Sequence, residues 1–296
     1  ISGTCGPTSV VNSLNRVTNS KEYTENKVLH DAMNNNLCYK DGGTNTRQIV
    51  NIIDCVKSPE SNIHAEVYAY DKALSVDDLA KRLDNSGTVA MDGTEAYGIY
   101  VKNNNTLSTA ATTLGINTGT GNLNLSGKKA IGMVADKGTL TNAAGGKINM
   151  TGQEQVGMYG NNSSILINNG EISLTASSTN IPSVGMYTED IATEITNNGK
   201  ITGGNNNYGI FGTTVTLGST GDISVGDTGV GVYSTEGNIT LNTGSKITVG
   251  ANEGVGVFTT GTNGRVITGN ADMIIGNNSF GYVLKNTGAT TFVTNS

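Results

Sequence analysis

Short apolar runs separated by polar turns recur along most of the chain, and each group starts with a glycine that precedes apolar residues. A typical copy is Val156-Gly157-Met158-Tyr159, which returns as Val184-Gly185-Met186-Tyr187. The glycines that mark the copies are Gly98, Gly132, Gly157, Gly185, Gly209, Gly231, Gly256 and Gly281. Their successive steps are 34, 25, 28, 24, 22, 25 and 25 residues. A repeat of this length is typical of a solenoid.

Two more strand-like pieces follow each glycine, such as Ile239-Thr240-Leu241 and, after a polar turn, Ser245-Lys246-Ile247-Thr248-Val249. Ile, Leu and Val alternate with polar residues at period two, so one face of each strand is apolar. Gly and Asn occupy the corners because both tolerate positive φ. Three strands per coil predict a mainly β protein, a right-handed parallel β-helix of about seven coils over residues 92–296.

Other repeat folds fit this pattern less well. A leucine-rich repeat needs a recurring leucine scaffold, which this sequence lacks. A calcium-binding nonapeptide repeat needs aspartates in register, but only asparagines follow Gly203-Gly204. A coil of about 25 residues is also too long for a hexapeptide β-helix.

Two details of the repeats bear on their packing. The pairs Asn168-Asn169 and Asn197-Asn198 lie one repeat apart, so we expect asparagine ladders along a corner. From Gly157 to Gly256, aromatic residues also follow five successive marker glycines by two positions and should form one stack. This stack could lie in the core or at its boundary, or it could point outward as a contact strip for a partner. We favour the core or its boundary, because an outward strip would be a large apolar patch. Its members are Tyr159, Tyr187, Phe211, Tyr233 and Phe258.

The composition changes near residue 91, which predicts two domains. Only 5 of the 41 glycines precede this point, whereas all three cysteines and both histidines do. Apolar residues at helical spacing predict helices after Thr8, over 23–34, after Thr44 and over 74–83, with a strand over 88–91. We therefore expect a small α+β segment over 1–91, followed by the β-helix over 92–296.

Cys5 is the candidate nucleophile of the N-terminal segment. Pro7 suits the first position of a helix, so Cys5 would lie at a helix N-terminus, which favours a thiolate. The run Gly3-Thr4-Cys5-Gly6-Pro7-Thr8-Ser9 resembles the nucleophile motif of papain-like cysteine peptidases of the bacteriocin-processing group. The resemblance covers about the first 90 residues and implies Cys5 as the catalytic residue.

The base of such a peptidase is missing from its usual place. In that family the histidine follows the position of Met91, whereas no histidine occurs here after His64. His64 would serve only in a different fold, and His30 is a poorer candidate, so we expect an incomplete peptidase. We expect no cofactor and no metal site. Cys38 and Cys55 form one disulfide in an oxidising compartment or remain two free thiols.

The repeats resemble passenger domains of large bacterial autotransporters, especially the fusobacterial type. The repeated sequence pattern that carries this resemblance spans 156–172 and 184–201. It implies an adhesive or display stalk, active in virulence, at the outer-membrane surface or secreted. Its partners would be a host-surface protein or a glycan, and its membrane link would be a C-terminal barrel that this chain does not contain.

Enzymatic alternatives remain open at this stage. One is a cysteine peptidase with a β-helical extension. The other is a β-helical carbohydrate-active enzyme, for which Glu189, Asp190 and Glu194 lie close in sequence, although solvated corners explain these carboxylates better. With a formal net charge of −6 and a pI near 4.9, no nucleic-acid partner is expected. The chain is interpreted as a fragment or an artificial join.

Overall fold

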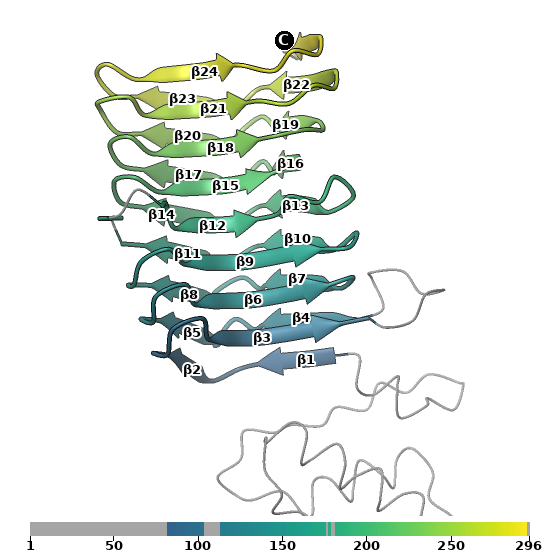
Figure 1. The fold of residues 1–296 in the computed structure, drawn as a ribbon, viewed down its shortest axis with the longest axis vertical. Coiled ribbons are helices and arrows are strands. Elements are labelled where there is room, and N and C mark those ends of the chain that lie inside the picture. The colour runs from purple at the N-terminus through teal and green to yellow at the C-terminus, as the bar shows by residue number, and fades with distance from the viewer. Residues whose placement is uncertain (1–81, 104–112, 176, 179–180, 295–296) are drawn as a thin grey trace, which may run out of the picture. The chain divides into compact units, whose positions relative to one another are not determined.

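The chain winds into a right-handed parallel β-helix in which each coil gives one strand to each of three sheets (Figure 1). The computed structural model describes residues 82–103, 113–175, 177–178 and 181–294. From residue 92 onward, the 21 strands β4 to β24 make seven complete coils. The predicted fold and number of coils are therefore confirmed.

The three sheets are named sheets A, B and C in the order in which a coil enters them. Sheet A contains β1 (Arg82–Asn85), β4 (Leu114–Asn117), β7 (Thr139–Asn142), β10 (Ile165–Asn168), β13 (Glu194–Asn197), β16 (Thr214–Leu217), β19 (Ile239–Leu241), β22 (Arg265–Gly269) and β25 (Thr290–Val293). Sheet B contains β2 (Thr88–Met91), β5 (Asn122–Leu125), β8 (Lys147–Met150), β11 (Glu171–Leu174), β14 (Lys200–Gly203), β17 (Asp222–Val225), β20 (Lys246–Val249) and β23 (Asp272–Ile275). Sheet C contains β3 (Tyr97–Lys102), β6 (Ile131–Asp136), β9 (Val156–Asn161), β12 (Val184–Tyr187), β15 (Tyr208–Gly212), β18 (Val230–Ser234), β21 (Val255–Thr259) and β24 (Phe280–Leu284).

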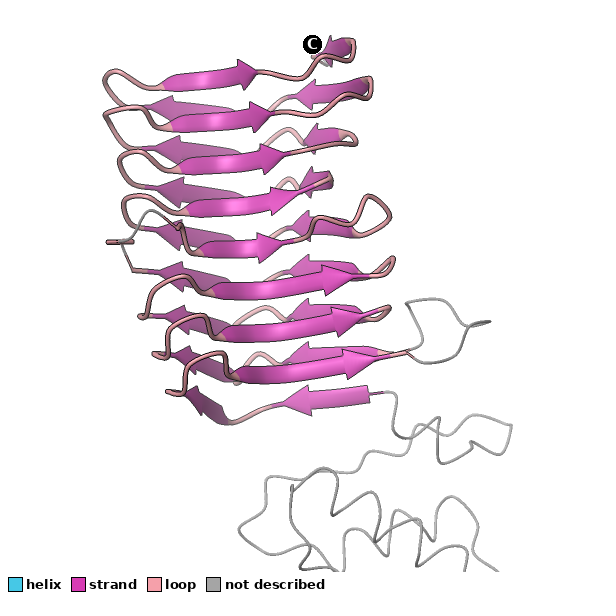
Figure 2. Cartoon of the chain, in the orientation of Figure 1, coloured by secondary structure: helices cyan, strands magenta, loops and turns pink. Residues whose placement is uncertain are grey.

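Strands and loops alone make up the described part of the chain, as Figure 2 shows. The marker glycines lie in sheet C, the alternating runs in sheet A, and the pieces after the polar turn in sheet B. Each of the three repeated pieces therefore forms the strand expected of it. Across the described ranges, no helix is long and apolar enough to cross a membrane.

The β-helix begins at Arg82, earlier than the predicted boundary at residue 92. Strand β1 pairs in parallel with β4, and β2 pairs in parallel with β5. Residues 82 and 83 are therefore in a strand, not at the end of the helix expected over 74–83. The strand expected at 88–91 is present, and it belongs to the first coil of the β-helix. The boundary was misplaced because the marker glycine lies on the third strand of a coil. The other elements expected in residues 1–81 lie outside the described residues.

The core is a continuous apolar column enclosed by the three sheets. Strands of sheet C direct side chains into it, and one column of these is fully buried in register over six coils. They are Met133, Met158, Met186, Ile210, Val232 and Val257. Sheets A and B add branched residues such as Leu166 and Ile172 from the same coil. A fully buried aliphatic side chain contributes roughly 1.5–3 kcal/mol.

The marker glycines form a column in which successive coils approach closely. A Cβ added to any of the first seven would lie 2.5–2.6 Å from the carbonyl oxygen of the next glycine in the column. Real Cβ atoms do not tolerate such a distance from a backbone oxygen, so a side chain here would push two coils apart. The repeated glycine therefore reflects coil-to-coil contact.

A buried asparagine ladder joins the first five coils at one corner of sheet A. Each Nδ2 donates to the Oδ1 of the asparagine in the next coil, at 2.7–2.8 Å. The members are Asn85, Asn117, Asn142, Asn168 and Asn197. A second, exposed bond runs from Asn198 to Asn169 at 2.9 Å. The predicted ladder is confirmed, and it extends further toward the N-terminus than the two quoted pairs.

We expect Gly231→Ala to lower the free energy of unfolding by about 1–3 kcal/mol, because the new methyl group overpacks the column. Its Cβ would meet the Gly256 carbonyl oxygen at 2.6 Å and Ile247 Cγ2 at 2.7 Å. Gly281→Ala is the matched control, since a Cβ there meets only Met273 Sδ, at 3.8 Å. Urea unfolding followed by circular dichroism measures both variants. Equal effects of the two substitutions would contradict the steric explanation.

We expect Asn168→Ala to destabilise the protein by about 1–3 kcal/mol, because it removes one ladder partner from each of two buried amides. Asn142 Nδ2 loses its acceptor at 2.8 Å, and Asn197 Oδ1 loses its donor at 2.7 Å. Asn198→Ala, in the exposed ladder, should change stability by no more than about 0.5 kcal/mol. The same unfolding measurement compares them, and the prediction is wrong if the exposed variant loses as much stability as the buried one.

Candidate binding face

The three sheets present different chemistry to solvent. The outer face of sheet A carries a column of threonines, interrupted by isoleucine, on consecutive strands. This column consists of Thr141, Ile167, Thr196, Thr216, Thr240 and Thr268. This column is polar and uncharged, and the exposed Glu194 of β13 lies in the neighbouring column of the same face.

The outer face of sheet B carries charges of alternating sign. In register, the column is Lys147, Glu171, Lys200, Asp222, Lys246 and Asp272. Opposite charges on neighbouring strands stabilise their pairing, whereas like charges oppose it. Lys147 Nζ and Glu171 Oε2 lie 3.8 Å apart. The charges of this face are thus compensated within the sheet.

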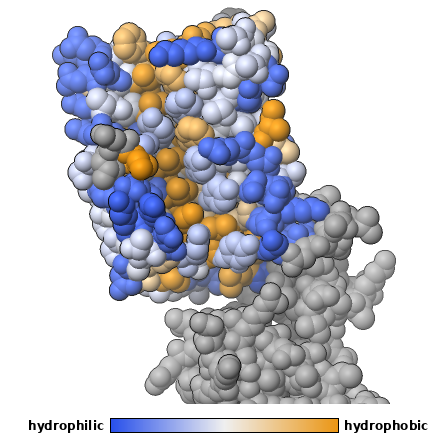
Figure 3. Space-filling view, in the orientation of Figure 1, coloured by the Kyte–Doolittle hydropathy of each residue, from blue (hydrophilic) through white to orange (hydrophobic). Residues whose placement is uncertain are grey.

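The outer face of sheet C carries two apolar columns over all eight strands, and we call it the aromatic face. Its first column is Tyr97, Ile131, Val156, Val184, Tyr208, Val230, Val255 and Phe280. Its second column is Tyr100, Val134, Tyr159, Tyr187, Phe211, Tyr233, Phe258 and Val283. Figure 3 shows the resulting apolar strip running along this side of the coils. An apolar strip that is continuous over the whole sheet is unusual on a protein surface and marks a contact site.

Five aromatic rings form the centre of the second column. The centroids are 5.6 Å apart for Tyr159–Tyr187, 5.1 Å for Tyr187–Phe211, 4.7 Å for Phe211–Tyr233 and 4.8 Å for Tyr233–Phe258. All five side chains are half-buried and lie outside the core cluster. The stack expected from the sequence exists. It points outward from sheet C and lies outside the core, so the outward strip is the arrangement found, and the favoured position in the core or at its boundary is wrong. Along the stack, each ring covers the face of the next.

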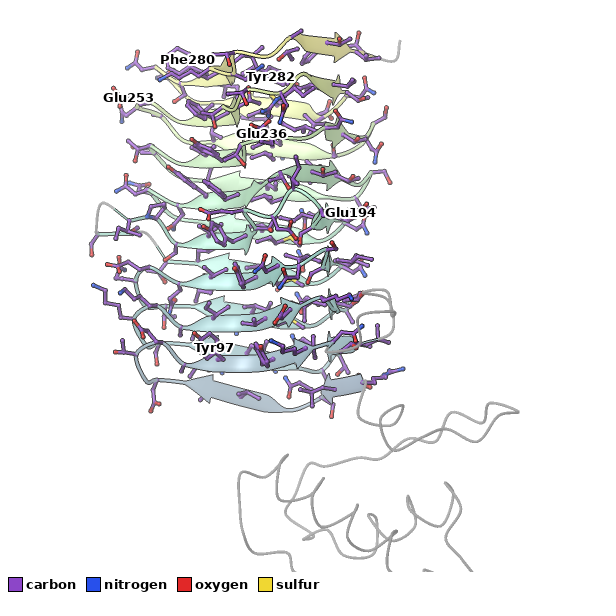
Figure 4. The ribbon with its side chains drawn as sticks, turned by 45° about the vertical axis from the view of Figure 1, so that its right-hand side comes forward. Tyr97, Glu194, Glu236, Glu253, Phe280 and Tyr282 are labelled. Atoms are coloured by element: carbon purple, nitrogen blue, oxygen red, sulfur yellow. The ribbon has the colours of Figure 1, made fainter. Side chains whose placement is uncertain are left out.

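Exposure is greatest at the two ends of the aromatic face. Tyr97 and Tyr100 are 59% and 52% exposed at one end, and Phe280 is 54% exposed at the other. Figure 4 shows Tyr97 and Phe280 near opposite ends of the stack of coils. In between, Val184, Val230 and Val255 are buried. The face is therefore a tightly packed surface with exposed ends.

Carboxylates beside the sheets hold the turns of adjacent coils. Asp190 accepts hydrogen bonds from the Ser163 amide at 2.6 Å, the Thr193 hydroxyl at 2.8 Å and the Ala192 amide at 3.1 Å. Burial alone would raise the pKa of Asp190, but these donors outweigh it, so the pKa lies below its usual value. These bonds occupy both oxygens of the carboxylate, which indicates a structural role.

The same arrangement recurs at other corners. Asp227 accepts from the Ala251 amide at 2.8 Å, one coil further on. Glu236 accepts from the Thr262 and Asn263 amides at 3.0 and 3.2 Å. The sequence led us to expect only solvated corners here. The signal in the sequence that could have revealed this role is an acidic residue at a turn. A second exposed turn lies one repeat away, and its backbone amides need hydrogen-bond acceptors.

The catalytic candidates Cys5 and His64 lie outside the described residues, as do His30, Cys38 and Cys55. Within the coils, the three carboxylates considered for acid catalysis do not act together. Asp190 holds its turn, whereas Glu189 and Glu194 are exposed. Among the described residues, no group of three His, Cys, Asp or Glu side chains could hold a metal ion.

Comparison with known proteins gives one match. Residues 109–203 are similar to a family described as the BigA third pectate lyase-like domain, which covers about a third of the chain. This segment includes strands β4 to β14 and therefore lies within the β-helix. No curated protein and no solved structure matches the sequence.

We expect Asp190→Asn to lower stability by about 1 kcal/mol at pH 7, after allowing for the partial exposure of the carboxylate. Because the folded-state pKa is depressed, the contribution of Asp190 is present above the unfolded-state value of about 3.9 and is lost as the pH falls through the folded-state pKa. The difference between the wild type and the variant should therefore shrink below about pH 4. Urea unfolding at several pH values measures it.

Asp92→Asn is the control for this titration, since Asp92 is exposed at another corner. It should leave stability nearly unchanged over the same pH range. A constant difference between Asp190→Asn and the wild type down to acidic pH would contradict the role given to the ionised carboxylate.

Proposed function

We propose that this chain is an adhesive β-helix of a bacterial surface or secreted protein, which contacts its partner through the aromatic face. The observation that carries the proposal is the pair of apolar columns, continuous over the eight strands of sheet C. Sheets A and B carry threonines and compensated charges instead. A chemically distinct face on a regular scaffold is a feature of a binding surface.

The similarity to the BigA domain supports a bacterial surface location, because domains of this family belong to bacterial surface proteins. An autotransporter passenger displayed outside the outer membrane is the more specific form of this proposal, and it rests on the sequence pattern of the repeats. The partners would be a host-surface protein or a glycan.

A carbohydrate-active enzyme is the second candidate, since the matched family is described as pectate lyase-like. The described residues give this candidate little support, because both oxygens of Asp190 accept hydrogen bonds from its own and a neighbouring turn. Peptidase activity would depend on Cys5, which lies outside the described residues. Binding therefore remains the better supported function.

We expect the double substitution Tyr187→Lys and Tyr233→Lys to weaken binding of the fluorescently labelled chain to cultured epithelial cells by about tenfold or more, because aromatic anchors dominate binding energy. The two lysines would place charge in the middle of the apolar strip. Flow cytometry measures the bound chain, and thermal unfolding confirms that the variant is folded.

The matched control is Thr196→Lys with Thr240→Lys, which places the same charges on the outer face of sheet A. This variant should bind as the wild type does. Equal loss of binding in both double variants, or no loss in either, would show that the aromatic face is not the contact surface.

A further inference from the structure

Exposed apolar side chains flank strand β12 at both of its ends. Ile181 precedes the strand and is 56% exposed, and Ile191 follows it and is 58% exposed. Val184 and Tyr187 lie between them, one in each column. The turn over 188–193, which carries Ile191, is a wider loop than the turns of the coils that follow it (Figure 1).

The ring stack favours a protein partner over a glycan. A sugar ring binds an aromatic side chain through its C–H groups, which are attracted to the negative face of the ring. Along the central stack, neighbouring rings already cover these faces, with centroids 4.7–5.6 Å apart. Lys285 Nζ lies 5.5 Å from the centroid of Phe258, over the last ring. The ring edges that remain accessible suit aliphatic and aromatic side chains of a protein.

Two exposed carboxylates beside β12 indicate the charge that a partner would carry there. Glu189 and Glu194 are exposed and flank Ile191 in the chain, and Glu194, labelled in Figure 4, is the first residue of β13 in sheet A. Across the described ranges neither carboxylate has a cationic partner, in contrast to Asp136, which pairs with Lys102 at 2.7 Å. The formal net charge of −6 adds a long-range attraction for cations.

We propose that the partner is a protein segment whose apolar side chains cover the aromatic face at β12 and whose lysine or arginine side chains lie opposite Glu189 and Glu194. This inference rests on the proposed function and narrows its partner to one class. Apolar contact supplies most of the affinity, and the basic residues supply orientation and speed of association.

The direct test uses fluorescence anisotropy of a labelled amphipathic peptide of leucine and lysine, titrated with the full chain. The matched peptide of leucine and glutamate should not bind. Ile191→Ser should weaken binding of the basic peptide by about fivefold or more. Ile274→Ser is the matched control, because Ile274 is 53% exposed but lies on β23 in sheet B, and it should have no effect.

Charge is tested with Glu189→Gln and Glu194→Gln together. This variant should bind the basic peptide several-fold more weakly at low salt and lose most of the salt dependence, because ions screen exposed charges. Glu253→Gln, at another exposed corner, should bind as the wild type does. Binding of both peptides alike, or equal effects of Ile191→Ser and Ile274→Ser, would overturn the proposal.

A competition experiment on epithelial cells separates this inference from the proposed function. The basic peptide should displace the labelled chain, and neutral or acidic plant oligosaccharides should not. Displacement by an oligosaccharide but not by the peptide would overturn the protein partner while leaving adhesion through the aromatic face in place. Peptide binding that depends on Ile191, without any binding to cells, would support the partner class and contradict the adhesive function.

Discussion

The close contact of successive coils at the glycine column is the constraint on which the rest of the fold depends. A carbonyl oxygen of one coil occupies the space that a Cβ of the preceding coil would need, and this holds from Gly98 to Gly256. Because sheet C is fixed at this spacing, the side chains on both of its faces fall into straight columns. The buried column of methionine, isoleucine and valine and the aromatic stack outside it are therefore two results of one backbone contact.

Specificity in this scaffold is divided among the sheets. The buried amides of sheet A and the alternating charges of sheet B each favour one alignment of neighbouring coils. Sheet C contributes little directional bonding on its outer face, so its side chains can differ in size and aromatic character from coil to coil. A face that does not set the register is the one that can be changed for binding.

Much of the fold could be predicted from the sequence, because the period of the apolar pattern and the Gly and Asn corners are local signals. The asparagine ladder followed from pairs one repeat apart, such as Asn168 and Asn197. The start of the first coil could not be found, since its marker, Gly98, comes last in the coil. The direction of Tyr187 was also predicted wrongly, since a position in the core or at its boundary was favoured and the ring points outward. The alternation of inward and outward side chains is broken at the marker glycine, because a Cβ there would point toward the next coil. The direction of Tyr187 therefore follows only from the register of the strands in three dimensions. The carboxylates that hold turns, such as Asp190, depend on contacts between coils and have no local signature.

The alternating charges of sheet B also limit how the number of coils can change in evolution. Loss of the coil that carries Lys200 would bring Glu171 beside Asp222, two like charges on adjacent strands. Loss of two consecutive coils would bring Glu171 beside Lys246 and restore the alternation. For this part of the protein, the unit that can be duplicated or deleted without electrostatic conflict is a pair of coils, so related chains should differ in length by even numbers of coils.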